Sequence, residues 1–321
     1  MAVTKPYKST GVKYLSPEWE TARKQLGIGG SEAASIIGFN PYSSAYAVYW
    51  NKVSEDAEER HISEAMRQGS DLEEYVVKRF CEATGKEVKR NNNMLQSKEF
   101  PFMLADVDRF IVGENAILEC KCSLNRDSYS YEDAANIPAY HLVQCLHYMA
   151  VVGADKAYLA TLVYGKDFHI VEIERKYFES DIKALIETEK RFWEENVLKK
   201  LPPLPDGTES STQAITRQFP LASDDMEKVD LSKYTSQLHH LSELKKEIAK
   251  LTDEKTGIEN LIKQTLGEAS IGECEGYKIS WKNRETTRLD SKALKADLPD
   301  IYAKYAKTST TRTFLFSEIQ E

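Results

Sequence analysis

The sequence is organised around one central stretch, Met103-Leu-Ala-Asp-Val-Asp-Arg-Phe-Ile-Val-Gly-Glu-Asn-Ala-Ile-Leu-Glu-Cys-Lys-Cys-Ser123. Its first part, Leu104–Val112, alternates apolar and polar residues, as a half-buried strand does. The turn residues Gly113-Glu-Asn115 follow, and Ala116–Cys122 then has the composition of a returning strand. The stretch therefore predicts a β-hairpin.

The hairpin is expected to gather charged side chains on one face. Alternate residues of a strand share a face, so Glu119 and Lys121 point one way and Cys120 points the other. Asp108 lies on the partner strand and is expected next to Glu119. Asp106, two residues earlier, is a competing candidate for the same role.

This residue set points to phosphodiester chemistry. Two converging carboxylates repel each other unless a cation lies between them. Magnesium prefers carboxylate oxygens and keeps water ligands that a phosphate substrate displaces. A lysine beside the ion activates an attacking water or neutralises the charge that develops at phosphorus. Asp108, Glu119 and Lys121 therefore predict a metal-dependent phosphodiesterase; a solvated surface pair is the alternative, and the apolar setting of the strand argues against it.

Composition bounds the class of protein. The 321 residues are enough for one large domain and a smaller one. A net charge of −8 argues against DNA binding by bulk charge, but it allows DNA in a local cleft that holds a metal. The mean hydropathy is −0.52, no apolar run approaches the ~20 residues of a membrane span, and the first residues lack the apolar core of a signal peptide. Five scattered cysteines suit a reducing cytoplasm.

Three further segments carry residues that a site would use. Gly27-Ile-Gly-Gly30 separates two predicted helices, and a glycine-rich turn before a helix N-terminus is a common phosphate site, although a tight helix–helix turn is the alternative. Residues 62–84 form a predicted amphipathic helix that contains Glu73. Residues 138–149 form another, on which Gln144 and Tyr148 lie one turn apart and share a face.

The pattern changes after residue 200. Residues 201–225 are rich in Pro, Ser and Thr, which predicts a linker between residues 1–200 and a C-terminal extension over 226–321. Within the extension, residues 231–266 repeat leucine and isoleucine at a spacing of three to four, as in an amphipathic, coiled-coil-like helix. Strands are predicted at 277–281 and 308–316, with a short helix between them over 290–305.

Six motifs follow one another in a recognisable order: Trp19-x-x-x-Arg23, Gly27-Ile-Gly-Gly-Ser31-Glu32, Gly69-x-x-x-Glu73, Ala105-Asp-Val-Asp108, Leu118-Glu119-Cys-Lys121 and Gln144-x-x-x-Tyr148. The first two thirds of the chain thereby resemble the YqaJ-type viral recombinase nucleases. These are relatives of phage lambda exonuclease in the PD-(D/E)xK superfamily. The resemblance implies a restriction-endonuclease-like α/β core, a mixed sheet flanked by helices in the order αβββαβ.

The resemblance also implies roles for the acidic residues and the lysine. Asp108 and Glu119 would bind one or two Mg²⁺ or Mn²⁺ ions, with the backbone carbonyl of Cys120 as a further ligand. Lys121 would orient or activate the attacking water. Glu73 would help to hold the metal, directly or through water.

The remaining implied roles concern the DNA. Arg23 and Ser31 would grip a phosphate, in exonuclease relatives the 5′-terminal one, and Gln144 and Tyr148 would line the active site. Two positions depart from the family pattern: Arg109 stands where glycine is common, and Leu146 replaces a second glutamine.

The resemblance implies a Mg²⁺-dependent 5′→3′ exonuclease on double-stranded DNA that leaves 3′ single-stranded tails for phage-type homologous recombination. It further implies a homo-oligomer, a trimeric ring in exonuclease relatives, a single-strand annealing or recombinase partner, and action in the bacterial host cytoplasm. Two alternatives stay open. One is an endonuclease on the same core, and the other is a non-catalytic DNA-binding or recombination-partner module.

Overall fold

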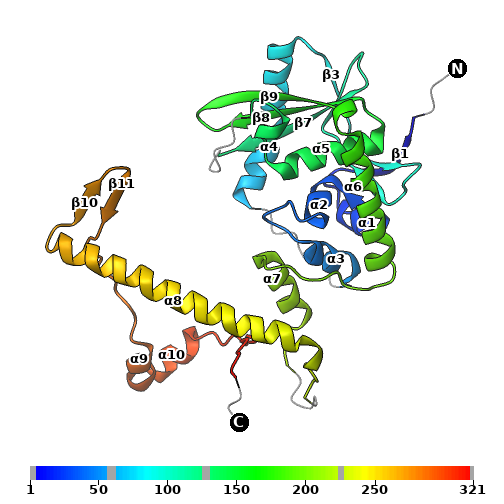
Figure 1. Ribbon diagram of the computed structural model, residues 1–321. Helices are drawn as coiled ribbons and strands as arrows, with labels where there is room; N and C mark the ends of the chain where they lie inside the picture. Colours follow the sequence, from blue (N-terminus) through cyan, green and yellow to red (C-terminus); the bar gives the residue numbers. More distant parts are fainter. Residues whose placement is uncertain (1–4, 56–62, 125–130, 223–227, 319–321) are drawn as a thin grey trace. The chain divides into compact units, whose positions relative to one another are not determined.

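The computed structural model describes residues 5–55, 63–124, 131–222 and 228–318. The chain divides into two compact units, Met1–Pro220 and Leu221–Glu321, and Figure 1 shows the elements of each. All charged residues singled out above lie in the first unit. Within the described residues, we find no helix with the length and apolar character that a membrane span requires.

The larger sheet of the first unit has five strands in the order β3-β6-β7-β8-β9. Their bounds are Val88–Arg90 (β3), Arg109–Ile111 (β6), Ala116–Ser123 (β7), Lys156–Val163 (β8) and Asp167–Glu174 (β9). Strands β7 and β8 are parallel and the other pairs are antiparallel. A parallel pair needs a crossover, and helix α5, Ala139–Val152, supplies it.

Helices cover both faces of this sheet. Helix α4, Glu64–Thr84, packs Val76 and Phe80 against Leu118 of β7. Helix α5 packs against the opposite face, where Ile117 of β7 lies in the same core as Met149. The order α4-β3-β6-β7-α5-β8 confirms the predicted αβββαβ arrangement, a mixed sheet flanked by helices.

A smaller sheet corrects the predicted hairpin. It has the order β1-β4-β5-β2, with bounds Tyr7–Lys13 (β1), Asn93–Ser97 (β4), Met103–Ala105 (β5) and Ile28–Gly29 (β2). The predicted hairpin is confirmed for Arg109–Ile111, which pairs antiparallel with β7. Its first strand does not extend back to Leu104, because β5 pairs with β4 and β2 instead. The chain crosses from one sheet to the other at Asp106–Asp108.

The remaining helices of the first unit are α1 (Trp19–Leu26), α2 (Gly30–Ile36), α3 (Ala45–Val53), α6 (Glu179–Arg191) and α7 (Glu209–Gln218). Short 3₁₀ turns occupy Ala134–Asn136 and Arg175–Tyr177, and a π-helical turn, Phe192–Val197, continues α6. Helix α7 packs on α3, where the Ser44 backbone N–H donates to Ser210 Oγ at 3.1 Å. The compact unit therefore ends at Pro220 rather than at residue 200, so much of the predicted linker is a packed helix; residues 223–227 lie outside the described residues.

The second unit is built on helix α8, Thr235–Leu266, after a 3₁₀ turn at Ser232–Tyr234. A hairpin of β10 (Ile271–Cys274) and β11 (Tyr277–Ser280) follows, then α9 (Ser291–Asp297) and α10 (Pro299–Tyr305). The predicted strand over 308–316 is wrong, because the structure pairs that segment with no strand. The Phe316 carbonyl instead accepts a hydrogen bond from Lys245 on α8, at 3.3 Å.

Candidate active site

Strand β7 carries the centre of the site. Glu119 and Lys121 face α5, as strand parity predicts, and Lys121 Nζ lies 2.6 Å from Glu119 Oε1. Glu119 is only 3% exposed, so this is no solvated surface pair. Asp108 lies alongside, since its Oδ2 accepts the backbone N–H of Cys120 at 2.8 Å. Asp106 is held elsewhere, by the indole N–H of Trp19 at 3.1 Å.

Helix α5 completes this arrangement with two side chains. Gln144 Nε2 donates to Glu119 Oε1 at 2.7 Å, and Gln144 Oε1 accepts from Lys121 Nζ at 3.1 Å. The same amide nitrogen lies 3.2 Å from the hydroxyl of Tyr148. The structure therefore brings Glu119, Lys121, Gln144 and Tyr148 into one hydrogen-bonded group next to Asp108.

The carboxylates gathered here carry more negative charge than the nearby cationic side chains neutralise. Burial and the neighbouring carboxylates of Glu119 and Glu73 raise the pKa of Asp108 well above its usual value. Burial also raises the pKa of Glu119, although Lys121 opposes that shift. Burial alone would lower the pKa of Lys121, but Glu119 and Asp108 outweigh it and raise the pKa. The two carboxylates beside it thus stabilise the ammonium form of Lys121.

A divalent cation fits this environment. Glu119 Oε2 is buried and has no hydrogen-bond partner among the described residues, so it is free to bind an ion. In the part of the chain that the structure describes, no three acidic, histidine or cysteine side chains form a complete metal cluster. An ion would therefore take Asp108 and Glu119, a backbone oxygen such as that of Cys120, and water, a mixture that suits Mg²⁺.

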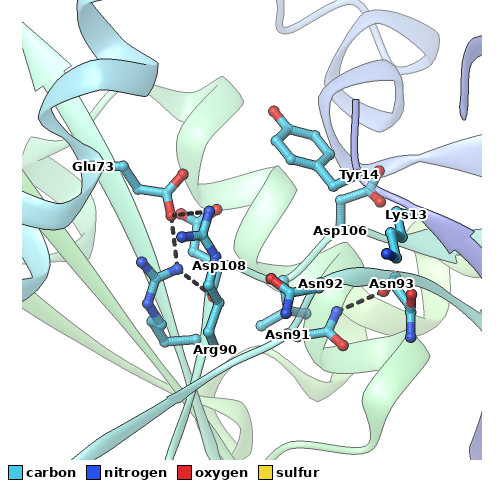
Figure 2. A pocket seen from close by; sticks show the side chains of 11 residues that line it. Lys13, Tyr14, Glu73, Arg90, Asn91, Asn92, Asn93, Asp106 and Asp108 are labelled. Atoms are coloured by element: carbon cyan, nitrogen blue, oxygen red, sulfur yellow. Dashed lines mark hydrogen bonds and ion pairs between the residues drawn. The ribbon is translucent and has the colours of Figure 1, made fainter. Parts of the chain in front are cut away.

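Glu73 reaches the site from α4 but is already ion-paired. Its Oε1 lies 2.7 Å from Nη1 of Arg109, while Nη2 of Arg109 lies 2.7 Å from Glu74. Glu73 lines one pocket together with Asp106 and Asp108, and Figure 2 shows it beside Asp108. The arginine that departs from the family pattern thus ties α4 to β6 and holds Glu73 at the site. The one signal in the sequence is a cation that directly precedes the apolar run Phe110–Val112.

Arg23 and Ser31 are in contact with each other, and Arg23 is close enough to Asp106 to oppose the rise that burial causes in the pKa of that carboxyl. Arg23 Nη2 donates to Ser31 Oγ at 2.5 Å, and its guanidinium lies over the Trp19 ring, 5.1 Å from the centroid. Helix α2 begins at Gly30 rather than at Ser31, and Glu32 accepts the backbone N–H of Gly29 at 2.8 Å. The predicted phosphate-binding pair is therefore close together at the start of α2.

The two glycines before Ser31 lie in close contact with other side chains of the site. A Cβ atom at Gly29 would lie 2.7 Å from Arg23 Nε, and one at Gly30 would lie 2.5 Å from the Tyr148 ring. No real Cβ atom tolerates such contacts without displacing its neighbour. Because these two positions have no side chain, the side chains of Arg23 and Tyr148 can both lie against the backbone of the turn.

Lys52 binds the backbone at both ends of the Arg23–Gly27 segment and the side chain of Glu32. The sequence does not predict this role. The Lys52 side chain is 2% exposed, and Nζ donates to the carbonyls of Arg23 at 2.8 Å and Gly27 at 2.7 Å. The same ammonium pairs with Glu32 at 2.9 Å. Burial would raise the pKa of Glu32, but Lys52 and Arg23 lower it to about 2. The one sequence signal is that Lys52 shares a helix face with the buried residue Val48.

Among solved structures, the chain is similar to the alkaline exonuclease LHK-Exo of Laribacter hongkongensis. The identity is 18%, the TM-score is 0.46, and the match covers 58% of this chain and 97% of that one. A structure of LHK-Exo in complex with dAMP gives 17% identity and a TM-score of 0.44, over 63% of this chain and 97% of that one.

Sequence comparisons relate the chain to a family model and to a named relative. Residues 18–155 match the model of the YqaJ-like viral recombinase domain, a range that includes every site residue described above. The protein YqaJ of Bacillus subtilis (strain 168) is 33% identical over 305 residues, which cover 94% of each protein. On these grounds, the chain belongs to the family of YqaJ-like viral recombinase proteins.

Proposed function

We propose that the chain is a Mg²⁺-dependent deoxyribonuclease, with Mn²⁺ as an alternative ion. It digests one strand of double-stranded DNA in the 5′→3′ direction and leaves 3′ single-stranded tails for phage-type recombination. The observation that carries the proposal is the buried Glu119, which is joined to Lys121 and Gln144 and lies beside Asp108. Membership of a viral recombinase family supports DNA as the substrate.

In this proposal each side chain has one task. Asp108 and Glu119 would hold the ion, which would supply Lewis-acid chemistry toward the scissile phosphate and the attacking water. Lys121, which donates a hydrogen bond to Glu119, orients or activates the attacking water beside the ion. Gln144 keeps both Glu119 and Lys121 in place by bonding to each of them.

Strand polarity is tested on a linear duplex in which one strand carries a label at its 3′ end. Digestion from the 5′ end yields labelled fragments that shorten progressively, and this is the expected pattern. Immediate release of the label as a mononucleotide would contradict the 5′→3′ direction.

The proposal assigns a terminal phosphate to Arg23 and Ser31. We expect Arg23→Met to raise the KM for a 5′-phosphorylated duplex about tenfold or more, because a charge-assisted hydrogen bond contributes about 1.5–3 kcal/mol. The KM for a duplex with a 5′-hydroxyl should change little. Steady-state kinetics on both substrates measure this, with Arg191→Met on the exposed end of α6 as the matched control. An equal loss on both substrates would rule out the phosphate contact.

Two alternative functions would each be indicated by a specific experimental result. Cleavage of closed circular DNA would indicate an endonuclease on the same core. Binding without any digestion would indicate a non-catalytic DNA-binding or recombination-partner module. Within the proposal, the enzyme acts in the bacterial cytoplasm as a homo-oligomer, a trimeric ring by analogy, and passes its 3′ tails to a single-strand annealing or recombinase protein.

A further inference from the structure

The pocket beside Asp108 has a second wall that the proposed chemistry leaves unused. The pocket encloses about 220 Å³. Glu73, Asp106 and Asp108 line one part of it, and Lys13, Tyr14 and Asn92 line another. Figure 2 shows Lys13 and Tyr14 near Asp106, while Glu73 and Asp108 lie together on the opposite side. A cation, an aromatic ring and an amide therefore share a pocket with the carboxylates of the site.

Backbone pairing holds this second wall together. Lys13 ends β1 and pairs with Asn93 of β4, and the backbone N–H of Tyr14 donates to the carbonyl of Asn92 at 3.0 Å. The Tyr14 ring meets the Trp19 ring edge to face, with centroids 5.3 Å apart. Trp19 in turn donates its indole N–H to Asp106. The two walls are thus connected through Trp19, and Tyr14 is oriented before any ligand arrives.

The Lys13 ammonium group and the Asn92 amide of this wall are available for a ligand. Arg90, the other exposed cation of the pocket, is paired with Glu74 at 2.7 Å. Within the described residues, the side chains of Lys13 and Asn92 have neither an ion pair nor a hydrogen bond, and both are exposed. An unpaired ammonium beside a free amide is suited to a phosphate, which accepts hydrogen bonds and carries negative charge.

We propose that Lys13, Tyr14 and Asn92 form a subsite for one nucleotide of the DNA strand that is cut. This inference rests on the proposed nuclease function and adds where the strand lies. Lys13 and Asn92 contact a phosphate, and the Tyr14 ring packs against the attached nucleoside. The contacts are independent of base sequence, because phosphates and ring faces are common to all nucleotides. The cation also offsets the repulsion between the strand and the three carboxylates that line the pocket.

The test compares two lysines of the same strand. Lys13→Ala removes the charge in the pocket, whereas Lys8→Ala removes the same charge from an exposed position of β1 outside the pocket. Binding of a fluorescein-labelled, 5′-phosphorylated duplex is followed by anisotropy in Ca²⁺, with salt varied. We expect Lys13→Ala to weaken binding about five- to tenfold and to reduce the log Kd against log salt slope by about one. Lys8→Ala should match the unmodified protein in both respects.

Two variants of Tyr14 and one of Asn92 extend the test. Tyr14→Ala is expected to weaken binding about five- to tenfold, in line with a lost stacking contact, and Tyr14→Phe to leave it unchanged. Asn92→Asp should weaken binding by placing a carboxylate against the phosphate. The proposal is overturned if Lys13→Ala and Lys8→Ala give the same affinity and the same salt slope.

Failure of the nuclease proposal would give a different experimental result from failure of the subsite proposal. If the unmodified protein digests no DNA in Mg²⁺, the enzymatic function is wrong, while the binding comparison between Lys13→Ala and Lys8→Ala still decides the subsite. If digestion proceeds and the two lysine variants bind alike, only the subsite is wrong. In the expected case, Lys13→Ala raises KM several-fold and leaves kcat within about twofold, as loss of a binding contact does.

Discussion

Glu119→Gln and Lys121→Met are each expected to lower Mg²⁺-dependent digestion of linear duplex DNA about a thousandfold, the scale of losing one preorganised electrostatic group at a reacting centre. The glutamine keeps the shape of the buried side chain but loses the charge that holds an ion. The methionine removes the only ammonium group that bonds to both Glu119 and Gln144 within the described residues. Initial rates measured over a range of enzyme concentrations give the size of each loss.

The sheet itself supplies a control for this prediction. Lys156 on β8 pairs with Glu172 on β9, but Glu172 is 45% exposed and the pair lies outside the site. Glu172→Gln and Lys156→Met should therefore retain full activity and show that an acid–lysine pair on this sheet is not in itself required. Circular dichroism and thermal melting check that all four variants fold. Digestion by Glu119→Gln at the unmodified rate would refute the role of that carboxylate.

The second large effect concerns stability. We expect His147→Leu to lower the free energy of unfolding by about 3 kcal/mol or more, because it leaves the buried carboxyl group of Glu189 without its partner. His147 Nδ1 lies 2.8 Å from Glu189 Oε1 and Nε2 lies 2.8 Å from the carbonyl of Leu104. Because a carbonyl only accepts, Nε2 carries a proton, and the pair ties α5 to α6 and to β5. Urea denaturation measures the loss.

A double-mutant cycle separates this interaction from simple packing. Glu189→Leu alone leaves the imidazole without its partner, whereas the double variant removes both polar groups and should lose less stability than the sum of the single losses. Glu187→Leu, at an exposed position of the same helix, should cost little. Strict additivity of the two single losses would mean that His147 and Glu189 are not coupled.

Local pattern was sufficient for the centre of the site. Within β7, a period of two determines which side chains share a face, so Glu119 and Lys121 were expected together and opposite Cys120. Within α5, the spacing of four determines that Gln144 and Tyr148 are neighbours. These relations depend on one element at a time, and the structure has them as predicted.

Contacts between different strands and helices could not be predicted from such local sequence patterns. Residues 104–112 alternate as one strand, yet the segment is divided between two sheets because β2 and β4 are the partners of β5. No local pattern contains that information. The partners of Arg109 and Lys52 were missed for the same reason, since Glu73 and Glu32 are 36 and 20 residues away. Residues 308–316 show the converse, a strand-like pattern that the described structure leaves without a partner strand.

The central claim is that this chain is a metal-dependent, end-dependent nuclease, and one digestion series tests it most directly. The purified protein is incubated with a linear duplex and with the same DNA as a closed circle, in Mg²⁺ and in EDTA. We predict loss of the linear duplex in Mg²⁺ alone, with the closed circle intact. Digestion of the linear duplex in EDTA would contradict the metal site at Asp108 and Glu119, and no digestion under any condition would contradict the enzymatic function.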